Sequence, residues 1–178
     1  MKRALLVLML LAAHASFAEL TTNPQGGFTS THVTTLPGSP DEIFDAMTGD
    51  ILPWWDHHFS ENPKSLRIEP WVGGRFIEEF DDEGNGALHA TVILCNRPNM
   101  IRFDGPLGLT GKALTHVVTY EFTPQQDSTQ VKVTVQLSGA IDTEWATIVD
   151  GVWKHFVIEA FQPYVLAGRH KDKPRLTR

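Results

Sequence analysis

Two stretches of alternating aromatic and polar residues hold the side chains best suited to chemistry. Phe76, Glu78 and Phe80 share one face of a predicted strand, and His116 and Tyr120 share one face of another. If the aromatic faces point inward, Glu78, His116 and Tyr120 enter an apolar interior, where burial raises the pKa of a carboxyl group. A nearby histidine that shares its proton would then make a general acid–base pair. The alternatives are that these are satisfied polar groups of a binding pocket, or that one strand faces the other way.

A second polar cluster, Asp56, His57 and His58, resembles part of a metal site. Adjacent residues do not converge on one ion, and no third ligand follows at the usual spacing. We therefore expect no metal and no cofactor, and interpret the cluster as the rim of a pocket beside Trp54 and Trp55. The sequence also lacks a nucleophile elbow, a phosphate-binding glycine loop and a Cys–His arrangement.

The segments that must position these side chains are mostly strands. Patterns of period two predict strands over 28–36, 66–70, 75–80, 88–94, 101–103, 113–123 and 130–138. Two short helices are predicted after the first strand, one starting at Ser39 and Pro40 and one carrying Leu52 and the tryptophan pair. The glycine-containing loop 105–111, with Leu107 and Leu109 expected to be exposed, is interpreted as a mobile flap near a cavity mouth.

A long amphipathic helix is predicted from Asp142, as N-cap, to about Gly168. A helix of ~25 residues is about 37 Å long and needs a large apolar surface to pack against. Trp153 and Phe156 lie at the centre of its apolar stripe, whereas His155 falls outside the stripe and is expected to be exposed. Pro163 predicts a kink near Gln162.

The two ends of the chain are predicted to lie outside the domain. Residues 1–18 have a basic start, an apolar run and small residues before Glu19, which is the pattern of a secretory signal peptide. We expect an exported protein, periplasmic or secreted, without a stable membrane anchor. Residues 19–27 are predicted to be a flexible lead-in, 28–168 a single domain, and 169–178 a disordered basic tail.

Charge and cysteine content narrow the possible partners. The net charge is −6, and loss of Lys2 and Arg3 with the leader makes it −8, which disfavours nucleic-acid binding. The single cysteine, Cys95, cannot form an internal disulfide, so stability must come from packing. The oligomeric state stays open.

The order of these elements, with several short motifs, resembles the START/Bet v 1-like (SRPBCC) superfamily, within it the Hsp90-ATPase-activator-like (AHSA1-like) and polyketide cyclase-like groups. The motifs are SPDEIF at 39–44, WW at 54–55, WVGGRF at 71–76, NRPNMIRF at 96–103 and GVW at 151–153. The resemblance implies an α+β helix-grip fold, in which a curved antiparallel sheet of about six or seven strands wraps the C-terminal helix around an apolar cavity. An exported protein would not meet the cytosolic chaperone that the AHSA1-like name suggests.

Three functions remain open. The first is binding or carrying a hydrophobic small molecule, with the ligand contacting Trp54, Trp55, Phe76, Glu78, Phe103, His116, Tyr120, Trp153 and Phe156. The second is a cyclase- or dehydratase-type enzyme that uses Glu78 and His116 as its acid–base pair. The third is a protein-interaction module, which predicts a filled interior and an exposed apolar patch.

Overall fold

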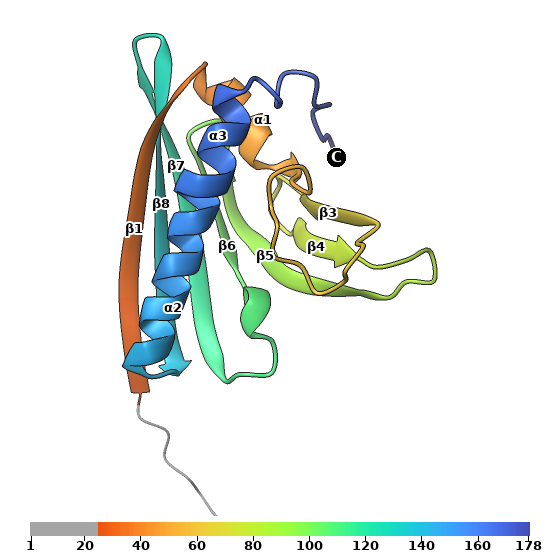
Figure 1. Ribbon diagram of the computed structural model, residues 1–178, viewed down its shortest axis with the longest axis vertical. Coiled ribbons are helices and arrows are strands. Elements are labelled where there is room, and N and C mark those ends of the chain that lie inside the picture. The colour runs from red at the N-terminus through yellow and green to blue at the C-terminus, as the bar shows by residue number, and fades with distance from the viewer. Residues whose placement is uncertain (1–24) are drawn as a thin grey trace, which may run out of the picture.

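One antiparallel sheet of eight strands forms the body of the molecule (Figure 1). The computed structural model describes residues 25–178, so the predicted signal peptide and most of the lead-in lie outside the described residues. The strand order is β1-β8-β7-β6-β5-β4-β3-β2. The strands are β1 (Gln25–Pro37), β2 (Gly49–Asp50), β3 (Ser65–Ile68), β4 (Arg75–Glu79), β5 (Gly86–Asn96), β6 (Met100–Asp104), β7 (Leu114–Gln125) and β8 (Ser128–Ala140).

The sheet bends around the C-terminal helix, as expected for a helix-grip fold (Figure 1). Two register shifts lie where it bends, one between Phe76 and Ile77 of β4 and one between Val92 and Leu94 of β5. An extra residue in one strand of a pair bends that strand and increases its twist. The shifts therefore let β3 and β4 turn away from the plane of β1, β8 and β7.

The strand count exceeds the predicted six or seven because of β2, a two-residue strand that pairs with β3. β1 also begins at Gln25, opposite Ala140, so residues 25–27 belong to the sheet rather than to a flexible lead-in. A strand of two residues is too short to show a period-two pattern, and the bounds of a strand are the least certain part of a sequence-based assignment.

Only one of the two predicted short helices forms. α1 (Pro40–Met47) starts as expected, because the hydroxyl of Ser39 accepts a hydrogen bond from the Glu42 N–H. The second is a turn, in which the N–H groups of Trp54 and Trp55 both donate to the carbonyl of Ile51. This turn is enough to bury both indoles.

The C-terminal helix runs from α2 (Thr143–Lys154) through η2 (His155–Phe161) to α3 (Gln162–Leu166). Asp142 caps it as predicted, accepting from the N–H of Trp145 at 3.0 Å. The departure from α-helical geometry begins at His155, earlier than the predicted kink near Gln162, and takes the form of a π-helix. Pro163 has no N–H to donate, and the Gln162 N–H reaches back to Val157.

The basic tail is not disordered as predicted, because it packs back onto α1. His170 is buried and its Nε2 lies 2.9 Å from Glu42, while the ammonium of Lys173 donates to the carbonyls of Asp45 and Ala46 at 2.9 and 3.0 Å. These carbonyls belong to the last turn of α1, where a cation is favoured by the helix dipole. Within residues 25–178, no helix is long and apolar enough to cross a membrane.

Candidate functional site

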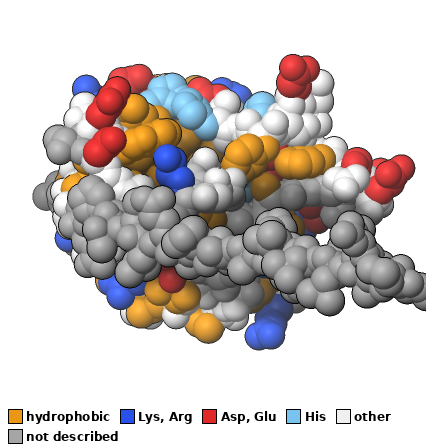
Figure 2. All heavy atoms as spheres, turned by 90° about the horizontal axis from the view of Figure 1, so that it is seen from below, with side chains coloured by type: hydrophobic (Ala, Val, Ile, Leu, Met, Phe, Trp, Pro, Cys, Tyr) orange, Lys and Arg blue, Asp and Glu red, His pale blue; other side chains and the backbone are white. Residues whose placement is uncertain are grey.

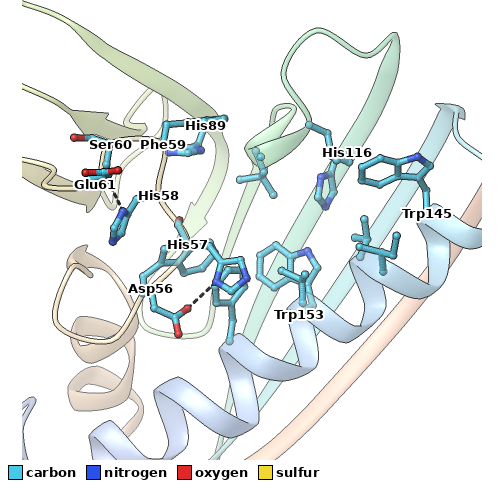
Figure 3. Close-up of a pocket in the computed structure, with 18 residues that line it drawn as sticks. Asp56, His57, His58, Phe59, Ser60, Glu61, His89, His116, Trp145 and Trp153 are labelled. Atoms are coloured by element: carbon cyan, nitrogen blue, oxygen red, sulfur yellow. Dashed lines mark hydrogen bonds and ion pairs between the residues drawn. The ribbon is translucent and has the colours of Figure 1, made fainter.

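A pocket of about 620 Å³ opens between α2, the sheet and two loops (Figure 3). Seen from below the view of Figure 1, hydrophobic and histidine side chains lie next to one another on the surface of the molecule (Figure 2). Its wall from the helix includes Trp145, Val149 and Trp153, and its floor includes His89 and His116. A pocket of this size suits a small molecule, and it favours the two ligand-based functions over a pure interaction module, for which a filled interior is expected.

The nine predicted ligand contacts divide into two layers. Trp55, His116, Trp153 and Phe156 line the pocket. The others lie outside its wall, in the packed core or its margin; they are Trp54, Phe76, Glu78, Phe103 and Tyr120. Aromatic residues of the two layers pack edge to face on one another, as Trp55 does on Phe76 at a centroid distance of 5.1 Å. The prediction that Glu78, His116 and Tyr120 point inward was therefore correct, but only His116 of the three lines the pocket, and the other two belong to the packed core.

His116 is the most unusual polar group of the pocket. It is 2% exposed, and neither ring nitrogen has a hydrogen-bond partner among the described residues. Burial lowers its pKa to about 4, and the nearby backbone of Pro106 offsets this only in part, without hydrogen-bonding geometry. The ring is therefore neutral at pH 7 and offers one donor and one acceptor to whatever fills the pocket.

Glu78 does not pair with His116, which contradicts the predicted acid–base pair. The carboxylate is fully buried and accepts from the N–H groups of Phe59 and Ser60 at 2.9 and 2.7 Å, and it lies 3.1 Å from His89 Nε2. Two strands, β5 and β6, separate it from His116. With both oxygens engaged, Glu78 fixes the loop that follows the tryptophan pair.

The partner of Glu78, His89, was missed by the sequence analysis. Alternation through Val92 would turn His89 outward, but the register shift places Ala90 opposite Phe76 and Leu88 opposite Ile77. His89 is the extra residue, so it is buried together with Ala90. Burial lowers its pKa, with the Glu78 carboxylate acting in the opposite direction. Nothing in a single sequence marks such a bulge.

At the rim of the pocket, the structure contradicts both sequence-based arguments against a metal site. The carboxylate of Asp56 lies 2.7 Å from His57 Nδ1 and 2.8 Å from His155 Nε2, although His155 is 99 residues away in the chain. Adjacent residues thus do converge, and the missing third ligand comes from the helix. His58 turns elsewhere, with its Nδ1 2.6 Å from the Ser60 carbonyl.

Comparison with known proteins places this fold in a family. The model for the activator of Hsp90 ATPase homolog 1-like protein (AHSA1) matches residues 37–165, most of the chain. The chain belongs to this family. No curated relative matches its sequence.

Solved structures share the fold of this AHSA1-like chain at low sequence identity. A Staphylococcus aureus protein of unknown function is 11% identical with a TM-score of 0.62, and covers 84% of this chain and 99% of its own. Norcoclaurine synthase from Thalictrum flavum, a point mutant in complex with a transition-state analogue, is 17% identical with a TM-score of 0.52, covering 83% and 99%. CalU16 from Micromonospora echinospora is 14% identical with a TM-score of 0.52, covering 80% and 84%.

In this AHSA1-like chain the predicted flap does border the pocket. It contains η1 (Leu107–Leu109), whose three residues all line the cavity. Leu107 is buried rather than exposed, at a positive φ of 50°, and Leu109 is partly buried. A leucine at such a φ is strained, and the conformation persists only where the surrounding structure over-determines it. Burial of this side chain against the core supplies that constraint.

Tyr120, the remaining catalytic candidate, is fully buried beneath the pocket. Its ring packs edge to face on Phe103 and Trp153, and its hydroxyl has no hydrogen-bond partner among the described residues. Burial raises its pKa. A phenol in this state holds its proton firmly, and Tyr120 does not line the pocket.

Proposed function

We propose that this protein is exported and binds a hydrophobic small molecule in the pocket beside α2, with His116 as its polar anchor. The observation that carries the proposal is the buried imidazole of His116, which has no hydrogen-bond partner within residues 25–178 and lies in the floor of an otherwise largely apolar cavity. An unsatisfied buried polar group is costly, so its retention is explained if a ligand completes its hydrogen bonds.

The pocket chemistry defines the ligand class. Apolar walls favour a hydrophobic body at about 25 cal/mol for each Å² removed from water. A neutral imidazole binds a carbonyl or hydroxyl group better than an ion, because no countercharge accompanies it in the floor. The ligand is thus a largely apolar molecule with one neutral polar group.

Intrinsic fluorescence tests this proposal, since Trp55, Trp145 and Trp153 all line the pocket. The protein is first loaded with the probe anilinonaphthalene sulfonate. The probe is then displaced by an aliphatic ketone or by an alkane of equal length. We expect the ketone to compete better than the alkane. The substitution His116→Leu should reduce the ratio of the two affinities about tenfold, which corresponds to the loss of one hydrogen bond.

The matched control is His32→Gln, because His32 lies on β1 outside the pocket and bonds Ser30. It should leave both affinities unchanged. Equal competition by ketone and alkane in the wild-type protein would remove the role of His116, and failure of the probe and both competitors to bind would remove the pocket proposal. Native mass spectrometry of protein from the exported fraction then looks for the natural ligand.

Export is a separate part of the proposal and rests on the pattern of residues 1–18. It predicts that protein recovered from the exported fraction begins at Glu19. Intact mass measurement decides this, and recovery of the uncleaved chain in the cytosol alone would contradict it.

A cyclase- or dehydratase-type enzyme is the second candidate, supported by the transition-state analogue bound by norcoclaurine synthase on a similar fold. Here His116 would act alone as the proton acceptor, because Glu78 is engaged. Such an enzyme requires His116→Gln to abolish turnover while the ligand still binds; a carrier loses affinity instead.

A further inference from the structure

Three side chains with metal-binding atoms meet at the mouth of the pocket. They are Asp56 and His57, from the loop after the tryptophan pair, and His155, the first residue of the π-helix. Their ligand atoms all lie within 4.8 Å of one another. All three remain open to solvent in part, so an aqueous ion can reach them. Figure 3 shows Asp56 and His57 side by side there.

Packing holds the loop and the helix together at this point. The indole of Trp55 stacks on Phe156, and its N–H donates to the carbonyl of His57 at 2.8 Å. The ring of His57 also packs edge to face on Phe156, at 4.9 Å. The meeting of His57 and His155 is therefore fixed by buried aromatic contacts, and does not depend on the exposed ion pairs alone.

Both ring nitrogens of His155 lie close to a carboxylate. Its Nδ1 lies 3.2 Å from the Glu159 carboxylate one helical turn on, which leaves Nε2 directed toward Asp56. A ligating histidine usually donates its other N–H to a carboxylate, which fixes the ring and raises its basicity. Glu159 fits this outer position.

The donor set narrows the type of ion. Two imidazoles and one carboxylate suit first-row transition cations such as Zn²⁺, and three protein ligands leave positions for water or a ligand. Around tetrahedral Zn²⁺, with bonds of about 2.1 Å, neighbouring ligand atoms are about 3.4 Å apart. The two contacts of Asp56, at 2.7 and 2.8 Å, are shorter than this by about 0.6–0.7 Å, a gap that side-chain rotations can open.

We propose that Asp56, His57 and His155 bind one divalent transition-metal cation at the mouth of the pocket, with Glu159 orienting His155. Asp56 and His57 also line the pocket, so the ion borders the space that the ligand occupies. The site stands independently of the proposed function, because it is built from rim residues and not from His116.

Asp56 and His155 also shift each other's pKa values. Hydrogen bonding to Asp56 raises the pKa of His155, and the Glu159 carboxylate adds to this. Partial burial favours a higher pKa for Asp56, but hydrogen bonds from His57 and His155 outweigh it and lower that pKa.

Isothermal titration of the untagged, chelator-treated protein with Zn²⁺ tests the proposal. We expect one Zn²⁺ per chain. Asp56→Ala and His155→Ala should each weaken binding at least tenfold, and Glu159→Gln about tenfold, as outer-shell substitutions do. His58→Ala is the matched control and should not change the affinity, because His58 faces the Ser60 carbonyl.

Co²⁺ provides a second readout, because its visible d–d absorption and its shifts of histidine NMR signals report the ligands directly. We expect the signals of His57 and His155 to move, and not those of His32 or His170. No Zn²⁺ binding by the wild-type protein would overturn the proposal, as would equal binding by Asp56→Ala and His155→Ala proteins that melt at the wild-type temperature.

Discussion

Glu78 and His116 are both enclosed by the same sheet, but the protein treats them in opposite ways. Glu78 of β4 accepts two backbone hydrogen bonds and contacts His89. His116 of β7 has no partner among the described residues and faces the pocket. A buried polar group with its full set of partners holds structure together, whereas one without partners is available to a ligand. Burial alone therefore does not identify a functional residue, and its hydrogen bonds decide.

The largest effect on stability should come from removing the carboxylate of Glu78. Glu78→Ala leaves the N–H groups of Phe59 and Ser60 and the ring of His89 without their acceptor inside the protein. We expect the free energy of unfolding to fall by about 3–5 kcal/mol, as when one partner of a buried charged network is lost. Urea denaturation followed by circular dichroism measures this. A loss below ~1 kcal/mol would mean that the hydrogen bonds of Glu78 do not stabilise the loop at Phe59 and Ser60.

The contribution of His116 should instead appear in the pH dependence of the free energy of unfolding. Its pKa in the folded protein is about 4, below the ordinary value of 6.5, so the unfolded chain takes up the proton first as pH falls. Stability is full above pH ~6.5 and is lost as pH drops toward 4, by about 2–3 kcal/mol at most.

The variant His116→Leu isolates this contribution from that of other acid-sensitive groups, His89 among them. Urea unfolding of both proteins between pH 7 and pH 4.5 provides the comparison. We expect the wild-type protein to lose more stability than the variant across this range. Parallel pH profiles would show that His116 is hydrated or partnered in solution, and would weaken the role assigned to it.

The outline of this contrast could be predicted from the sequence because it depends on local pattern. Alternation places Glu78, His116 and Tyr120 on inward faces, and all three are buried as expected. The order of short motifs identified the helix-grip fold, which the family match confirms. Period-two patterning is a property of neighbouring residues, so one sequence is enough to show it.

What the sequence could not supply depends on contacts between distant segments. The bulge that buries His89 is set by the pairing of β4 with β5, and the meeting of Asp56 with His155 by packing of a loop on the helix. The tail was predicted to be disordered because it is basic and contains proline, yet the ammonium of Lys173 donates to carbonyl groups at the C-terminal end of α1. Partners of this kind appear only in three dimensions.

Tyr120 gives the smallest and most discriminating test of the comparison. Its hydroxyl, like the ring of His116, has no partner among the described residues, but it lies outside the pocket wall. Removing an unsatisfied buried group relieves a cost, so Tyr120→Phe should leave the free energy of unfolding unchanged or raise it by up to about 1 kcal/mol. Probe binding should stay at the wild-type level, because Tyr120 does not line the pocket. If Tyr120→Phe destabilises the protein by about 1 kcal/mol, the hydroxyl is bonded to buried water, and lack of a protein partner then stops being a sign of ligand binding at His116 as well.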